Sequence, residues 1–175
     1  MTIVIAELKK NLPSKVIVNA IPINPVLANP SIKEIADALH AKVLFGENYI
    51  NNQAGSFSVG AMQLHNYLMY IEENGLVITP GDRADIILGA LQANISDKYP
   101  SISGIVLSGG LMPENSIIKL IEGLSDVVPI LSAEGGTFSV ANSIGMIKSQ
   151  IYAENPGKIT TSIKDFENYE QSEAL

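Results

Sequence analysis

The chain changes repeatedly from short β-branched runs to helical periodicity. Three successive stretches show it, residues 77–95, 104–124 and 128–151, and each passes from an apolar run through a glycine-containing loop into a helical pattern. Such alternation is typical of a parallel sheet covered by helices, because parallel strands need a crossover connection. We therefore predict an α/β fold, a three-layer α/β/α sandwich with a largely parallel sheet.

The strands of this sheet are predicted from β-branched enrichment and length. They are Lys15–Ala20, Lys42–Phe45, Leu76–Thr79, Ser103–Leu107 and Val128–Ser132. Parallel connections are almost always right-handed, so the loops that follow the last three strands should emerge at one edge of the sheet. Open α/β sheets usually bind ligands at that edge.

Local signals also predict the helices. Ser31 and Glu34 form a capping-box pattern before a helix that should run to about Leu39. Residues 58–75 are expected to form another helix, with an apolar stripe and Gly75 at its end. A third should begin near Asp82 or Asp85, and an acidic, weakly apolar helix should run from about Ser162 to the end of the chain.

Composition limits the classes of partner. The chain has 175 residues, of which 46% are hydrophobic and 17% charged, which favours one compact domain. Its formal net charge of −7 disfavours nucleic acid and anionic membranes as partners. There is no cysteine, which excludes thiolate metal sites and suits the cytoplasm. No apolar run approaches the length of a membrane span, and no targeting peptide is evident.

Three strand-to-helix loops contain the candidate site: residues 79–85, 107–116 and 132–139. Helix N-termini there offer unpaired N–H groups, and glycine permits close approach of an anion. We predict that Arg83 holds a small anionic metabolite, with Asp82 orienting Arg83 or capping the helix. The remaining ligand-binding candidates are Ser108, Gly109, Gly110 and Thr137. The alternative is that the glycines only form steep turns, while Asp82, Ser116 and Thr137 cap helices.

Catalytic patterns are missing from the sequence. It contains no GxxxxGK[ST] run and no strand-linked GxGxxG. His40 and His65 belong to no HExxH motif or nearby carboxylate cluster, so both are predicted to be structural or surface residues. Asp82 and Asp85, three residues apart at a helix start, fit the helix dipole better than acid–base catalysis. We therefore expect no catalytic residues, no metal and no cofactor.

Two stretches, VITPGDRADIILGAL and GIVLSGGLMPENSIIKLI, resemble the DRTGG domain family. The family's Asp-Arg pair and Thr-Gly-Gly triplet correspond to Asp82, Arg83, Ser108, Gly109 and Gly110, with serine in place of threonine. The segments VNAIPINPVLANPSIKEIADALHAKVL and PILSAEGGTFSVANSI extend the similarity, which covers about Asn19 to Ile163. The former resembles the segment that leads into this domain in bacterial phosphate acetyltransferases.

The resemblance implies a fold like the N-terminal domain of HPr kinase and a domain that lies between a nucleotidyl-hydrolase-like region and an acetyltransferase catalytic domain. It divides the chain into a leading segment, residues 1–30, a DRTGG domain, residues 31–163, and a C-terminal tail, residues 164–175. The implied role is noncatalytic: regulation by a metabolite, or subunit assembly, with the catalytic domain of the parent chain as a partner.

Three alternatives to a regulatory domain of this enzyme are compatible with the sequence. The domain also occurs in other proteins, including some with CBS domains, so the parent enzyme is an inference from resemblance. A purely structural role would use an apolar helix face with Met62, Tyr67 and Tyr70 to form a homo-oligomer. A free-standing enzyme would be the third class, and it predicts turnover by this chain alone.

Overall fold

The computed structural model describes residues 7, 8, 10–13, 16, 21–153 and 155–170, and the described residues fall into two compact units. Asn29–Ser149 form the larger unit, and the described residues on either side of it form the smaller one. The smaller unit pairs α2 (Pro25–Ala28) with α8 (Pro156–Glu170), and the Asn24 amide donates a 2.7 Å hydrogen bond to Asp165.

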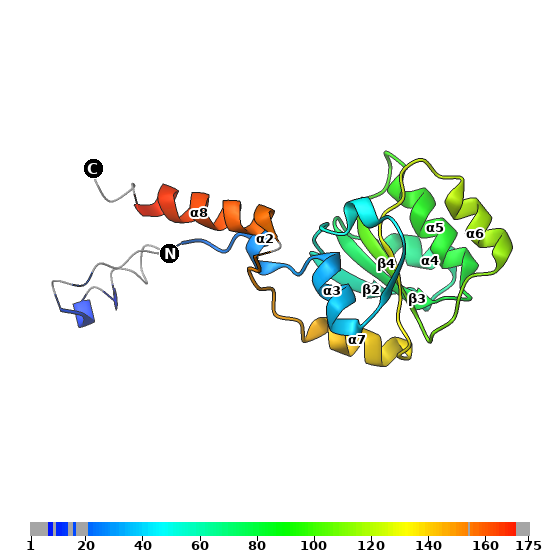
Figure 1. The fold of residues 1–175 in the computed structure, drawn as a ribbon, viewed down its shortest axis with the longest axis horizontal. Coiled ribbons are helices and arrows are strands. Elements are labelled where there is room, and N and C mark those ends of the chain that lie inside the picture. The colour runs from blue at the N-terminus through cyan, green and yellow to red at the C-terminus, as the bar shows by residue number, and fades with distance from the viewer. Residues whose placement is uncertain (1–6, 9, 14–15, 17–20, 154, 171–175) are drawn as a thin grey trace. The chain divides into compact units, whose positions relative to one another are not determined.

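The larger unit is built on one five-stranded sheet (Figure 1). Its strands are β1 (Lys42–Phe45), β2 (Ser56–Val59), β3 (Gly75–Pro80), β4 (Ile102–Ser108) and β5 (Ile130–Ser132). They lie in the order β1-β5-β4-β3-β2. The β2, β3, β4 and β5 strands are parallel, whereas β1 runs antiparallel to β5 at one edge.

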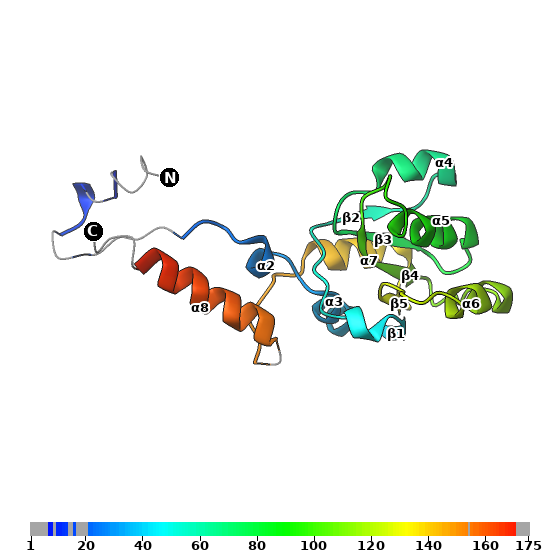
Figure 2. The same cartoon turned by 90° about the horizontal axis from the view of Figure 1, so that it is seen from above.

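Helices cover both faces of this sheet, which confirms the predicted three-layer fold (Figures 1 and 2). One face carries α3 (Ile32–Leu39) and α7 (Thr137–Gly145). The other carries α4 (Leu64–Tyr67), η2 (Leu68–Tyr70), α5 (Ala84–Asn94) and α6 (Asn115–Glu122). A short helix, η1 (Glu47–Tyr49), follows β1.

Alternating side chains of the central strands divide the core into two layers. Val77 and Ile105 face α5, while Leu76, Ile78 and Val106 face α3 and α7. All five are at most 2% exposed. Each such burial contributes about 1.5–3 kcal/mol relative to an exposed side chain, so these central strands provide much of the stability of the domain.

The capping box predicted at Ser31 is present. The Ser31 hydroxyl accepts a 3.2 Å hydrogen bond from the Glu34 N–H, and the Ser31 N–H donates to the Glu34 carboxylate at 2.8 Å. The helix ends at Leu39, where His40 adopts a left-handed conformation with a φ of 49°.

The predicted helix over residues 58–75 is wrong. This stretch contains the end of β2, then α4 and η2, and Gly75 begins β3 instead of ending a helix. Strand pairing outweighs the helical periodicity here, because β2 pairs in register with β3. Directly after β2, Gly60 packs so closely against Ile86 that a Cβ at this position would overlap the Ile86 side chain. The apolar stripe predicted at Leu64, Leu68 and Ile71 is confirmed, because Ile71 lies in the core that α5 lines and the two leucines pack against it.

The other predicted elements match more closely. The strands from Lys42, Leu76, Ser103 and Val128 correspond to β1, β3, β4 and β5 with small shifts at their ends. The strand predicted over Lys15–Ala20 lies largely outside the described residues. The last helix begins at Pro156, earlier than expected. Of the helices in the described part of the chain, none is long and apolar enough to cross a membrane.

Candidate functional site

The three glycine-containing loops meet at the carboxyl edge of the sheet. The ends of β3 and β4 are in register at Pro80 and Ser108, and β4 pairs Leu107 with Ser132 of β5. The amide of Gly81 donates to the carbonyl of Ser108 at 3.4 Å. The predicted convergence of the loops on one edge is therefore confirmed.

Two hydroxyl groups from different loops form a hydrogen bond at this edge. Ser108, the last residue of β4, is fully buried, and its Oγ lies 2.8 Å from Oγ1 of Thr137. Thr137 is the first residue of α7, and the N-cap is Gly136. Ser108 and Thr137 thus tie the second loop to the third.

The glycine amides that were expected to bind an anion have partners within the protein. Gly109 N–H donates to the carbonyl of Gly135 at 2.8 Å, and Gly110 N–H donates to the carbonyl of Ala133 at 2.9 Å. Both glycines have positive φ, 83° and 63°. The Glu134 carboxylate lies where a Cβ on Gly110 would be, which places negative charge beside this turn. An anion would meet repulsion here.

Arg83 is directed toward the loop after β2 instead of toward Gly109 and Gly110. Its guanidinium donates to the carbonyl of Met62 at 2.8 Å and to those of Gly60 and Ala61 at 3.4 Å each. Nε and one terminal nitrogen bind the Asp85 carboxylate in a bidentate pair, at 2.9 Å each. Arg83 thereby joins the start of α5 to residues 60–62.

This pair shifts the acid–base equilibria of both groups. The hydrogen bond from Arg83 lowers the pKa of Asp85 below its ordinary value, and the same bond to Asp85 raises the pKa of Arg83. The Arg83 side chain is 29% exposed and that of Asp85 47%, so solvent reaches both. The pair is therefore accessible to a competing anion.

The predicted capping roles are wrong in their details. The N-caps of α5, α6 and α7 are Arg83, Glu114 and Gly136, and none of them caps through its side chain. The carboxylate that orients Arg83 is Asp85, while Asp82 is exposed and contributes only a longer-range attraction. The reason is local: Arg83 itself occupies the N-cap position, so Asp82 precedes the first helical turn.

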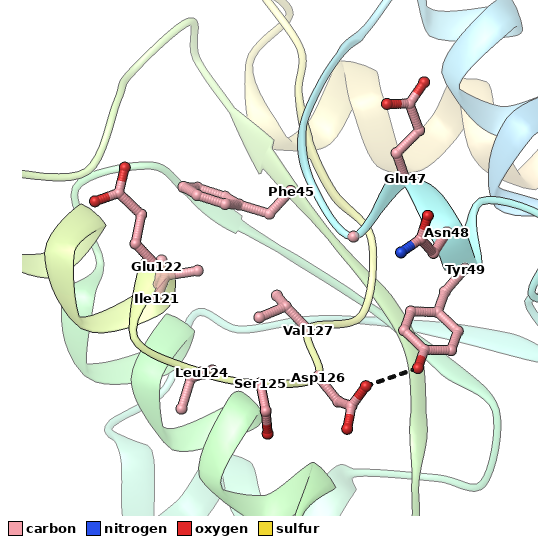
Figure 3. Close-up of a pocket in the computed structure, with 11 residues that line it drawn as sticks. Phe45, Glu47, Asn48, Tyr49, Ile121, Glu122, Leu124, Ser125, Asp126 and Val127 are labelled. Atoms are coloured by element: carbon pink, nitrogen blue, oxygen red, sulfur yellow. Dashed lines mark hydrogen bonds between the residues drawn. The ribbon is translucent and has the colours of Figure 1, made fainter.

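Sequence reasoning missed two other features of the larger unit. One is a pair of clefts at the opposite, amino edge of the sheet, both lined by Tyr49 and Asp126. The Tyr49 hydroxyl donates a 2.9 Å hydrogen bond to Asp126, which Figure 3 shows together with the smaller cleft. The other is an apolar groove of about 560 Å³ between α4, α5 and α6. The groove combines residues of three helices, and the clefts combine residues far apart in the sequence, so no local motif marks either feature.

The structure bears on two further predictions, the absence of a metal site and the residues of the proposed interface. Within the described ranges no group of three or more His, Asp or Glu side chains is placed to hold a metal ion. Of the proposed interface residues, Met62 and Tyr70 are 40% and 57% exposed, but Tyr67 is buried at 1% and its hydroxyl bonds to Ser58. Tyr67 therefore belongs to the core, and its assignment to an interface is wrong.

Comparison with known proteins finds a matching domain family and similar enzymes. A model of the DRTGG domain matches residues 34–147. The chain is 36% identical over 170 residues to phosphate acetyltransferase from Nitratidesulfovibrio vulgaris, a match that covers 97% of this chain and 24% of that protein. It is 37% identical over 160 residues to phosphate acetyltransferase from Synechocystis, covering 91% of this chain and 23% of that protein. The chain thus spans about a quarter of these relatives.

Among solved structures, the fold is similar to the CBS and DRTGG domains of the regulatory region of Clostridium perfringens pyrophosphatase, complexed with its activator diadenosine tetraphosphate. The TM-score is 0.54 at 21% identity, over 85% of this chain and 65% of that one. At this identity the similarity supports the fold.

Proposed function

The chain belongs to the DRTGG domain family, and from that premise we propose that it is a noncatalytic regulatory domain of a phosphate acetyltransferase. Such an enzyme transfers an acetyl group between acetyl-CoA and phosphate. The observation that carries the proposal is the alignment with the Nitratidesulfovibrio enzyme, which takes in 97% of this chain but only 24% of the enzyme. A segment of that size leaves room for a separate catalytic domain, the partner on which this domain would act.

The proposed effector is a small anionic metabolite that competes with Asp85 for Arg83. Both side chains are partly solvated, and a guanidinium binds phosphate or carboxylate in the same bidentate geometry. An anion that displaces the Asp85 carboxylate from Arg83 would draw Arg83 away from residues 60–62. The position of this loop relative to α5 would then change. The anionic activator of the structurally similar pyrophosphatase region supports an effector of this class.

Calorimetric titration of the chain with diadenosine tetraphosphate tests the anion site. Arg83→Ala should weaken binding at least about tenfold, and Asp85→Asn should strengthen it by removing the competing carboxylate. Lys98→Ala, which removes an exposed positive charge elsewhere, is the matched control and should change little. If Arg83→Ala binds as tightly as the unmodified chain, Arg83 only braces the turn; circular dichroism will establish that each variant folds.

The regulatory role is tested in a chimera. The matching segment of the Nitratidesulfovibrio enzyme is replaced by this chain, and acetyl phosphate formation is measured with and without diadenosine tetraphosphate. The chimera should respond to the effector, a chimera with Arg83→Ala should not, and the isolated chain should form no acetyl phosphate. Turnover by the isolated chain would contradict the proposal and favour a free-standing enzyme.

A second candidate function is homo-oligomer assembly, favoured by the apolar groove between α4, α5 and α6. Leu64, Leu88 and Leu124 line it, and Ile95 and Leu120 beside them are each 56% exposed. Apolar surface of this kind commonly marks an interface. Sedimentation equilibrium should then show a dimer that Leu120→Glu dissociates, while Lys119→Glu on the same helix leaves it intact. A monomer at all concentrations would exclude this role for the isolated domain.

A further inference from the structure

A cleft of about 400 Å³ opens at the amino edge of the sheet, where β3 and β4 begin. Four carboxamide side chains contribute to its lining, and they come from the loop after η1, the turn before β3 and the end of α5. We name it the amide cleft. Its principal residues are Tyr49, Asn52, Gln53, Asn74, Asn94 and Asp126.

The carboxamides leave both donors and acceptors free. Asn94 Oδ1 accepts a 2.9 Å bond from the N–H of Ile102, which leaves its NH₂ group available. Asn52 donates weakly, at 3.4 Å, to the carbonyl of Ser103, which leaves its oxygen available. The side chains of Gln53 and Asn74 have no hydrogen-bond partner among the described residues. A polar group in a cleft gains more from a ligand when the protein has not already satisfied it.

Charge in and around the cleft disfavours an anionic ligand. Among the described residues that line it there is no Lys, Arg or His, and the lining includes the carboxylate of Asp126. The neighbouring cleft, of about 260 Å³, adds Glu47 and Glu122 (Figure 3). A phosphate group in the amide cleft would therefore approach the Asp126 carboxylate with no cationic partner among the described lining residues. The ligand of the amide cleft must be neutral or positively charged.

Tyr49 supplies a flat, neutral wall between the two clefts. Its hydroxyl donates to Asp126 across 2.9 Å, and this bond raises the pKa of the phenol, so the ring stays neutral (Figure 3). Tyr49 is 41% exposed, which leaves surface for a ligand. Planar heterocycles stack favourably on such a ring.

We propose that the amide cleft binds a nucleobase or nucleoside without phosphate groups, which the free amides of Gln53, Asn74 and Asn94 recognise by its hydrogen-bonding edge. Carboxamides match the paired donor and acceptor atoms of a base, as Asn and Gln do with adenine. The volume of about 400 Å³ lies within the usual range for small-molecule sites. This site is separate from the anion site proposed at Arg83 and does not depend on it.

The test follows the side-chain amide signals of the full chain by ¹H–¹⁵N NMR during titration with adenosine, guanosine, cytidine and uridine. At least one nucleoside should shift the signals of Asn74 and Asn94 with a dissociation constant of about 1 mM or lower. The matching 5′-monophosphate should bind about tenfold more weakly, because its phosphate approaches Asp126. Tighter binding of the monophosphate at these signals would overturn the proposal.

The double variant Gln53→Glu, Asn74→Asp removes two amide donors without breaking an internal side-chain bond. It should weaken nucleoside binding at least about tenfold. Asn142→Asp, an equivalent change at an exposed position of α7, is the matched control and should leave binding unchanged. The proposal fails if no nucleoside shifts these signals, or if the double variant binds as well as the unmodified chain.

Discussion

The two edges of the sheet differ in where their polar groups find partners. At the carboxyl edge, the Arg83 guanidinium, the amides of Gly109 and Gly110, and the Ser108 hydroxyl all bond within the protein. At the amino edge, Gln53 and Asn74 line a cleft without a side-chain partner in the described part of the chain. The edge with the recognisable motif is internally satisfied, while the edge without one has unused hydrogen-bonding capacity.

This difference indicates what the motif residues do within the fold. Their hydrogen bonds join three loops and the start of α5, so an anion at this edge has to compete with existing bonds. Such competition is suited to a switch, because binding requires a structural change. The amino edge requires no bond to be broken, so a ligand there would bind without displacing an internal partner.

The largest expected effect concerns the packing of the carboxyl edge. A Cβ on Gly81 would overlap the carbonyl oxygen of Leu111, so Gly81→Ala forces two loops apart. We expect it to lower the free energy of unfolding by about 3 kcal/mol, measured by urea denaturation. Gly136→Ala is the matched control, since nothing lies within 4 Å of its Cβ, and it should cost about 0.5 kcal/mol or less. Equal effects at both positions would show that this edge is not tightly packed.

A smaller effect is expected for the bond between the two hydroxyls. Ser108→Ala leaves Oγ1 of Thr137 without its 2.8 Å partner in a half-buried position. It should lower the free energy of unfolding by about 1 kcal/mol. The double variant Ser108→Ala, Thr137→Val should lose less than the sum of the single changes, because no unpaired hydroxyl remains. Strict additivity in a double-mutant cycle would mean that the two hydroxyls do not interact.

Local patterns predicted the fold well. The capping box at Ser31 and the βα transitions around residues 77–95 depend on neighbouring residues only, and both were confirmed. The antiparallel direction of β1 and the presence of β2 could not be predicted, because they depend on pairing with strands distant in the sequence. A run of four residues such as Ser56–Val59 is too short for its period to be decisive.

The candidate site was predicted only in part. The meeting of the loops follows from parallel topology, which the sequence pattern contains. The direction of the Arg83 side chain depends on residues 60–62, a loop whose position is set by the strand that was missed. The amide cleft brings together Tyr49 and Asp126, 77 residues apart, and no local signal could have identified it.

The pair of Arg83 and Asp85 should make stability depend on pH. The pKa of Asp85 is lowered in the folded state. The pair therefore contributes to the free energy of unfolding above the ordinary pKa of an aspartate, near 4. The contribution disappears as the pH falls through the lower, folded value. Arg83→Ala should therefore cost about 1 kcal/mol or less at pH 7, given the exposure of the pair, and progressively less below about pH 4. A difference that stays constant with pH would assign the loss to the carbonyl contacts instead.

The smallest expected effect is at the amino edge, where removal of the unpartnered amides should hardly change stability. Gln53→Ala and Asn74→Asp remove amides that have no partner within the described residues, so each should change the free energy of unfolding by about 0.5 kcal/mol or less. Asn94→Ala, at the same edge, is the contrasting control, since it removes the acceptor of the Ile102 N–H and should cost about 1 kcal/mol. Urea denaturation of the three variants measures these changes in the free energy of unfolding. If Gln53→Ala proves as costly as Asn94→Ala, these amides serve the fold, and the two edges are alike in having their polar groups satisfied by the protein itself.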